Sequence, residues 1–156
     1  MVSFFCQDVN FTLKNKRLYK NWLTGIAQQK GQKLKALAVV FCSDIYLLDL
    51  NRRFLGHDYY TDVITFAAHL EGKERASQDK SLRKKQLGIE GDICISIDTV
   101  RINAEQYGAS FLEELARVMA HGLLHLLGYK DVTPKEQAIM RQEEERALYV
   151  LHTLLG

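Results

Sequence analysis

The sequence predicts an α+β fold in which helices pack on one small mixed β-sheet. Its 156 residues match the size of one domain. Apolar residues (47%) and charged residues (26%) occur at ordinary globular frequencies. Strand-like and helix-like segments follow one another along the whole chain, which contains one proline. We therefore expect a single domain over residues 1–156.

Apolar runs and helical spacing predict the elements of the first half. Leu18, Trp22 and Ile26 recur at helical spacing between lysines, which predicts an amphipathic helix. Ser43 is a residue type that caps helices and precedes another such pattern. The expected elements are a strand over 2–9, a helix over 13–30, a strand over 34–42, a helix that begins after Ser43 and a strand over 63–67.

Capping motifs define the second half more sharply. Ser110 and Glu113 have the spacing of a capping box, and so do Thr133 and Glu136. Gly128 suits the left-handed position that ends a helix. The expected elements are a polar loop over 71–88, a strand over 89–97, a helix capped by Ser96 or Asp98 that runs to about 107, a helix from Ser110 to about 127 and a final helix to about 154.

Composition excludes several classes of protein. No run of about 18 apolar residues is present, so we expect no membrane span. The first residues lack the basic leader and apolar length of a signal peptide. Cys6, Cys42 and Cys94 are odd in number and lie among apolar neighbours, which indicates buried thiols in a reducing compartment. We expect a cytoplasmic protein that does not bind membranes.

The net charge of +2 names no partner, but its distribution is uneven. Seven basic residues and one acidic residue fall within the first 35 positions, and a second basic stretch is Arg83-Lys84-Lys85. Two interpretations stay open. The lysines and arginines either cover solvated helix faces and a loop or form a surface that attracts phosphates.

The chemistry is carried by a segment that begins at His121. His121 and His125 are four residues apart on a predicted helix, so their side chains lie on the same face and can reach one metal ion. Gly128 ends that helix, and Asp131 follows three residues later as a possible third ligand. Two histidines and one carboxylate leave a fourth position for water, which is typical of a catalytic zinc site with one Zn²⁺ per chain.

The same segment resembles the motif His-x3-His-x5-His of the YbeY family, bacterial endoribonucleases of ribosomal RNA maturation. Two further stretches extend the resemblance. Leu50 to Phe66 is similar to the family's Leu-Asn-x2-Tyr-Arg-x2-Asp-x-Pro-Thr-Asx-Val-Leu-Ser-Phe, and Gly91 to Ile95 is similar to its Gly-Asp-Ile-x-Ile strand. The order and spacing agree over roughly residues 35–150.

The resemblance implies a zincin-like metal-binding helix and a zinc-dependent endoribonuclease specific for single strands. It further implies late processing of the 3′ end of small-subunit ribosomal RNA, ribosome quality control, and binding to the small ribosomal subunit, with ribosomal proteins or GTPases as possible assembly partners. His121, His125 and Asp131 would hold the ion and act through its bound water.

Two departures from the family pattern concern the site. Asp131 stands at the third histidine, where aspartate is still a competent zinc ligand. Leu55 stands at the family's arginine, which is expected to hold RNA phosphate. Arg52, Arg53 or His57 could supply the missing cation, and we name Arg53 and His57 as candidate substrate-binding residues. The alternative is that these are solvent-facing cations at a helix end.

Two other functions are alternatives. A ribosome-assembly factor with a structural metal and little nuclease activity would explain the missing arginine. A metallopeptidase of the His-Glu-x-x-His type is disfavoured, because Gly122 stands where those enzymes place their general base. Asp62 and Asp92 are candidates for proton transfer or for supporting the ligands, although such aspartates more often cap a strand or a turn.

Overall fold

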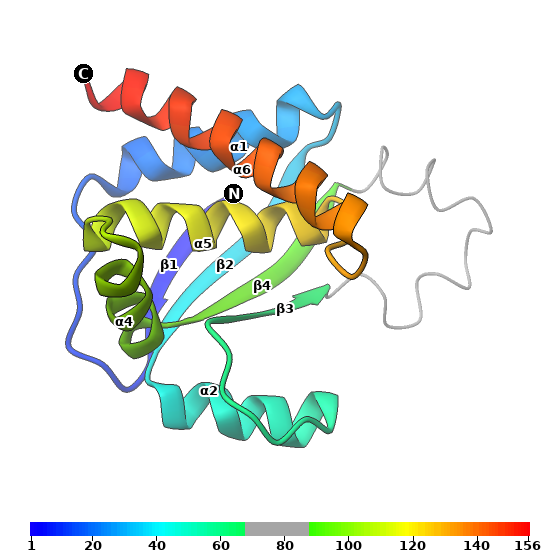
Figure 1. Cartoon of the computed structure of the whole chain (residues 1–156). Helices are drawn as coiled ribbons and strands as arrows, with labels where there is room; N and C mark the ends of the chain where they lie inside the picture. Colours follow the sequence, from blue (N-terminus) through cyan, green and yellow to red (C-terminus); the bar gives the residue numbers. More distant parts are fainter. Residues whose placement is uncertain (68–87) are drawn as a thin grey trace.

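A four-stranded mixed sheet forms the centre of the computed structural model, which describes residues 1–67 and 88–156. Its strands are β1 (Val2–Cys6), β2 (Leu34–Cys42), β3 (Val63–Ala67) and β4 (Ile89–Ser96), in the order β1-β2-β4-β3. Strands β1, β2 and β4 are parallel to one another, and β3 pairs antiparallel to β4 (Figure 1). The predicted α+β class with a small mixed sheet is confirmed.

Helices cover both faces of the sheet. Figure 1 shows α5 against one face with α1 and α6 beyond it, and α2 beneath the other face. The bounds are α1 (Lys16–Gln29), α2 (Asp44–Leu50), α4 (Ile97–Tyr107), α5 (Phe111–Leu126) and α6 (Pro134–Leu155). A single turn of π-helix, η1 (Asn51–Leu55), continues α2. The predicted loop over 71–88 lies, apart from Gly88, outside the described residues, and so does the basic stretch Arg83-Lys84-Lys85.

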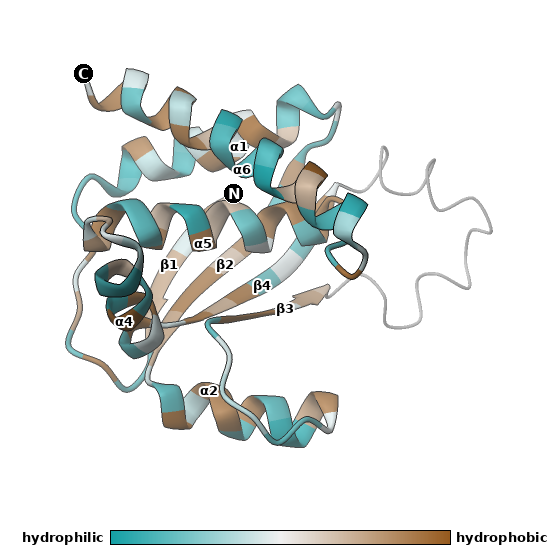
Figure 2. Ribbon diagram, in the orientation of Figure 1, coloured by the Kyte–Doolittle hydropathy of each residue, from teal (hydrophilic) through white to brown (hydrophobic). Residues whose placement is uncertain are grey.

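Side chains that point alternately to the two faces of the sheet divide the core into two layers. Ile93 and Ile95 of β4 belong to the large cluster that includes the buried face of α5. Cys94, which lies between them, packs with Leu47 of α2 and Ile64 of β3 in a smaller cluster. Figure 2 shows apolar residues along the strands, whereas the helices alternate apolar and polar residues. Successive strand residues point to opposite faces, so β4 is buried on both of them.

Side-chain caps hold the starts of α2, α4, α5 and α6. Ser43 accepts a hydrogen bond from the backbone of Tyr46, and Thr133 and Glu136 form both halves of the predicted capping box. Ser96, rather than Asp98, caps α4. At α5 the Ser110 side chain accepts from the backbone of Glu113, and this half of the predicted box forms. The predicted boundaries therefore hold to within a few residues.

The cysteines correct one prediction. Cys42 and Cys94 are buried, and burial raises their pKa values to about 12 and about 11. Cys6 is exposed, because it ends the edge strand β1. All three thiols are free. Within residues 1–67 and 88–156, no helix combines the length and the apolar character needed to cross a bilayer.

Candidate metal centre

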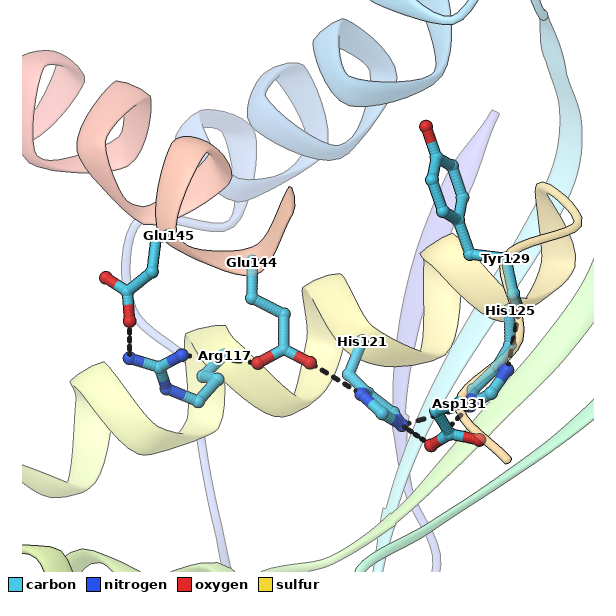
Figure 3. A network of polar contacts seen from close by, with 7 residues as sticks. All are labelled: Arg117, His121, His125, Tyr129, Asp131, Glu144 and Glu145. Atoms are coloured by element: carbon cyan, nitrogen blue, oxygen red, sulfur yellow. Dashed lines mark hydrogen bonds and ion pairs between the residues drawn. The ribbon is translucent and has the colours of Figure 1, made fainter. Parts of the chain in front are cut away.

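The two histidines predicted as ligands meet Asp131 at the end of α5. His121 Nε2 lies 3.0 Å from His125 Nε2, and Asp131 Oδ2 lies 3.3 Å and 3.4 Å from these two nitrogens. Figure 3 shows both rings leaving the same side of the helix and the carboxylate facing them from the following segment. The three residues form a group of potential metal ligands among the described part of the chain.

The spacing of these three atoms fits a zinc ion. Ligands at tetrahedral corners lie about 3.3–3.4 Å apart when the metal–ligand bonds are about 2.0–2.1 Å long. The three observed separations of 3.0, 3.3 and 3.4 Å bracket that edge. Two imidazoles and one carboxylate are also a donor set that zinc accepts, and catalytic zinc sites with three protein ligands leave the fourth position to water. The residues present therefore fit the ion.

The second nitrogen of each imidazole is bound to the protein. His121 Nδ1 lies 2.6 Å from Glu144 Oε2, and His125 Nδ1 lies 3.0 Å from the backbone oxygen of Tyr129. Both partners are acceptors, so each Nδ1 carries the proton and donates it. With Nδ1 as the donor, Nε2 of each ring is the nitrogen that can bind a metal, and both Nε2 atoms lie beside Asp131. This tautomer is the one that a metal requires.

Glu144 is a buried carboxylate, only 7% exposed, on the face of α6 that packs against α5. Its other oxygen accepts from Arg117 Nη1 at 3.2 Å, and Arg117 also binds Glu145 at 2.8 Å (Figure 3). Burial of His121 acts to lower its pKa. The hydrogen bond and charge of Glu144, with Asp131 and Asp62, outweigh burial and raise the pKa of His121.

A glycine turn delivers both Asp131 and the carbonyl that holds His125. Gly128 adopts a φ of 107°, its N–H donates to His125 O, and the next N–H, of Tyr129, donates to Leu124 O. These paired bonds are a Schellman motif, which ends helices at a left-handed residue. The turn folds residues 129–131 back over the last turn of α5. Lys30 of α1 lies 5.4 Å from the Tyr129 ring and binds Glu143 of α6 at 2.6 Å.

A groove of about 770 Å³ opens over the ligands. One wall consists of the ligands and the glycine turn, and the other consists of η1 and the segment that leads into β3. Lys130 is an exposed cation on the ligand wall, and Asp62 is a carboxylate on the opposite wall. Burial raises the pKa of Asp62, although the positive charge of His121 opposes the rise.

The structure separates the remaining candidate residues. His57 lines the groove and so does Leu55, which stands where the resembling family has arginine. Arg53 is exposed and binds Asp49 at 3.2 Å, and Arg52 pairs with Asp58. Neither arginine belongs to the groove lining.

Asp62 and Asp92 are both candidates for proton transfer on the basis of the sequence, but they lie in different surroundings. Asp62 lines the groove, whereas Asp92 is an exposed residue of β4 that does not reach it. Of the two candidate carboxylates, only Asp62 is placed to meet a substrate bound over the ligands.

Gly122 occupies the position where peptidases of the His-Glu-x-x-His type carry their glutamate, and the packing explains the glycine. A Cβ atom on Gly122 would lie 2.7 Å from Ile93 Cγ2 of β4, well inside van der Waals contact. The face of α5 next to His121 therefore rests directly on the sheet. A general-base glutamate has no space there.

The fold and the donor set define a class of protein, an α+β domain with three potential metal ligands at the end of a helix and in the segment after the glycine turn. Comparison with known proteins identifies the family. The family model described as Endoribonuclease YbeY matches residues 3–152. The chain belongs to the YbeY family, which confirms the resemblance seen in the sequence and its enzyme class, a hydrolase of the endoribonuclease type.

Curated relatives agree over nearly the whole chain. Endoribonuclease YbeY of Cytophaga hutchinsonii is 44% identical over 148 residues, which is 94% of this chain and 93% of the relative. That of Bacteroides thetaiotaomicron is 40% identical over 94% of this chain and 96% of its own. A Thermotoga maritima protein, known from a solution structure, has the same fold, with a TM-score of 0.61 at 24% identity over 97% of this chain and 89% of that chain.

Glu144 and the Tyr129 carbonyl belong to the site but were not predicted from the sequence. A backbone oxygen has no sequence signal, but Glu144 has one. The buried positions of α6 are Met140, Glu143, Glu144, Ala147, Leu148 and Leu151. Two glutamates thus stand within a stripe that otherwise has apolar residues at helical spacing. A carboxylate in such a stripe indicates a buried cationic or proton-donating partner.

Proposed function

We propose that this chain is a zinc-dependent endoribonuclease, specific for single strands, that processes ribosomal RNA late in the maturation of the small-subunit 3′ end. The observation that carries the proposal is the open site of His121, His125 and Asp131 at the base of a groove with an exposed lysine. Membership of the YbeY family supports RNA as the substrate. The domain that does this work is proposed to span residues 1–156.

Zinc is proposed as the ion because its preferred ligands and geometry match the site. Bound there, Zn²⁺ supplies Lewis acidity to a phosphate oxygen and lowers the pKa of a water ligand. The protein's own contribution is to hold the donors. Glu144 and the Tyr129 carbonyl keep the protons of the two imidazoles on Nδ1, so that both Nε2 atoms stay available.

The walls of the groove are proposed to handle the RNA. Lys130 neutralises phosphate charge from the ligand wall, and Asp62 accepts a proton across the groove, where its raised pKa makes it a stronger base than an ordinary aspartate. His57 is proposed to contact the substrate from within the groove. Arg53 is a further proposed contact, which requires its guanidinium to leave Asp49. Exposed ion pairs of this kind are weak, so that exchange costs little.

The test is cleavage of RNA by the purified full chain. Protein with one equivalent of Zn²⁺ is expected to cut single-stranded RNA and small-subunit precursor RNA, but not duplex RNA of the same sequence. Chelator and the His125→Ala substitution should both stop the reaction. Cleavage that survives in His125→Ala protein, or that is equal on duplex RNA, would overturn the proposal.

A second candidate is a ribosome-assembly factor with little nuclease activity. Leu55 in the groove wall favours it, because an apolar side chain cannot hold the phosphate that an arginine would. In that case zinc-loaded wild-type protein would bind small ribosomal subunits but leave their RNA intact. The cytoplasmic location, ribosome quality control and the ribosomal-protein or GTPase partners remain predictions in either case.

A further inference from the structure

Two rings stand stacked on the wall of the groove opposite the metal ligands. His57 and Tyr59 have ring centroids 5.1 Å apart and planes within 18° of parallel. The Tyr59 hydroxyl lies 2.9 Å from His57 Nδ1 and donates to it when the imidazole is neutral. Both residues line the groove, yet Tyr59 is 55% exposed. A large ring that is half exposed beside a site is available to a ligand.

The backbone of the stacked pair is held by one buried residue, Asn51. Asn51, 1% exposed, lies at the start of η1 and accepts a hydrogen bond from the N–H of His57 through its backbone oxygen. Its Nδ2 donates to the backbone oxygen of Tyr59 at 2.9 Å. Gly56, at a φ of 68°, allows the chain to turn sharply between η1 and His57. The backbone that carries the two rings is therefore held by contacts within the protein, and the rings contact each other.

Neighbouring aromatic residues do not combine an exposed ring with a place in the groove lining. Tyr60 is 60% exposed but does not line the groove. Phe54 is also outside it and packs edge-on against Phe66, with centroids 5.8 Å apart. Among the phenylalanine and tyrosine rings of residues 51–66, Tyr59 is therefore the one that lines the same groove as His121, Asp131 and Lys130.

We propose that the His57–Tyr59 pair is a base-stacking platform that takes the nucleobase of a nucleotide next to the scissile phosphate. The inference rests on the proposed endoribonuclease function and adds a base subsite to it. Stacking needs only the flat face of a base, so the platform accepts all four bases and prefers unpaired strands. It also gives the RNA a hold on this wall that does not depend on charge, where Leu55 offers no cation.

The experiment measures RNA cleavage while the protein and the substrate are each changed, alone and together. The substrate is a single-stranded RNA of about 12 nucleotides, within the site sizes of single-strand binders. Tyr59→Leu should lower kcat/KM roughly 5- to 150-fold, the range for loss of one stacked base, mainly through KM. Tyr59→Trp should retain activity. Tyr60→Leu and Tyr149→Leu, at exposed tyrosines outside the groove, should match wild type.

Abasic substrates identify the contact. Removal of one base next to the cleavage point should weaken wild-type cleavage to the level of Tyr59→Leu and have little further effect on that variant. Equal loss in both proteins at every abasic position would overturn the platform. If wild-type protein cleaves no RNA, the proposed function fails instead. The platform is then judged by fluorescence anisotropy of the same RNA with zinc-free protein, where Tyr59→Leu must still bind more weakly.

Discussion

The two walls of the groove are built in different ways. The ligand wall consists of one helix and the turn that follows it, and buried polar contacts from α6 support it, such as Glu144 on His121. The opposite wall, from η1 to β3, carries surface contacts. Arg52 pairs with Asp58 and Arg53 with Asp49, and all four side chains are more than half exposed.

This difference suits the roles that we propose for the two walls. Metal ligands must stay within a few tenths of an ångström of their positions, which requires packed and hydrogen-bonded supports. Exposed ion pairs contribute about 0–1 kcal/mol each and exchange easily, so the ion pairs of the opposite wall can rearrange at little cost. Asn51 is the exception there, since it is buried and fixes the ring pair.

The largest effect is expected from removal of a ligand. His121→Ala and His125→Ala should each lower zinc affinity by orders of magnitude, because a three-ligand protein site cannot hold the ion with two. Elemental analysis of protein purified without chelator should show about one zinc per wild-type chain and almost none in the variants. The fold should persist, since neither histidine belongs to the main core cluster.

Asp131 sharpens the same test. Asp131→Ala should lose zinc like the histidine variants, whereas Asp131→His should retain it, because histidine occupies this place in the family pattern. His152→Ala, at an exposed histidine of α6, is the matched control and should keep its zinc. Unchanged zinc in Asp131→Ala would mean that the third ligand is another group.

Loss of the support on His121 is expected to have the next largest effect. Glu144→Ala should weaken zinc binding by about 10- to 100-fold, the usual range for a residue that orients a ligand. Glu144→Gln should lie at the low end, since an amide oxygen can still accept from Nδ1. Competition with a zinc-binding dye measures both. Glu145→Gln is the control because Glu145 contacts Arg117 and not the imidazole. If the three variants bind zinc with equal affinity, Glu144 contributes to packing only.

Charge changes on the two walls should alter RNA binding more modestly. The plot of log affinity against log salt has a negative slope, and Lys130→Gln should make it shallower by about 0.7, the value for one phosphate contact on a single strand. Leu55→Arg should make the slope steeper by a similar amount, since a guanidinium can bind a phosphate through two hydrogen bonds. Titrations at several salt concentrations provide the slopes. Lys135→Gln, an exposed lysine of α6 outside the groove, should leave the slope unchanged. A slope that does not respond to Lys130→Gln would remove this lysine from the RNA path.

The smallest effect concerns a carboxylate away from both walls. Burial raises the pKa of Glu114 on α5, although Arg117 acts to lower it. A carboxyl group with a raised pKa in the folded state contributes stability below its ordinary pKa of 4.5, and this contribution is lost as the pH rises through the folded value.

Glu114→Gln should therefore stabilise the protein slightly at neutral pH and flatten the fall in stability above about pH 4.5. Urea unfolding at a series of pH values measures this. Glu113→Gln, at the neighbouring half-exposed glutamate, is the control. If Glu114→Gln shows the wild-type pH dependence, the carboxyl group is better solvated than its burial implies.

Much of the site could be predicted because its geometry is local. The i, i+4 spacing places His121 and His125 on one face of any α-helix, and a glycine after the helix permits the turn that returns Asp131. The same holds for the caps at Ser43 and Thr133 and for the strand at Leu34–Cys42, whose limits match those found. These features depend on residues within a few positions of one another.

Only the tertiary structure decided the features that join distant residues. Glu144 reaches His121 from 23 positions away because α6 packs on α5. The opposite wall exists because β3 pairs antiparallel to β4 and brings Asp62, Leu55 and Tyr59 over the ligands. Cys6 is exposed because its strand lies at the sheet edge. The sequence by itself determined which side chains could hold a metal, because short-range backbone geometry sets their spacing. Packing between elements determined what supports those side chains and what faces them, because such contacts depend on how the whole chain buries its apolar surface.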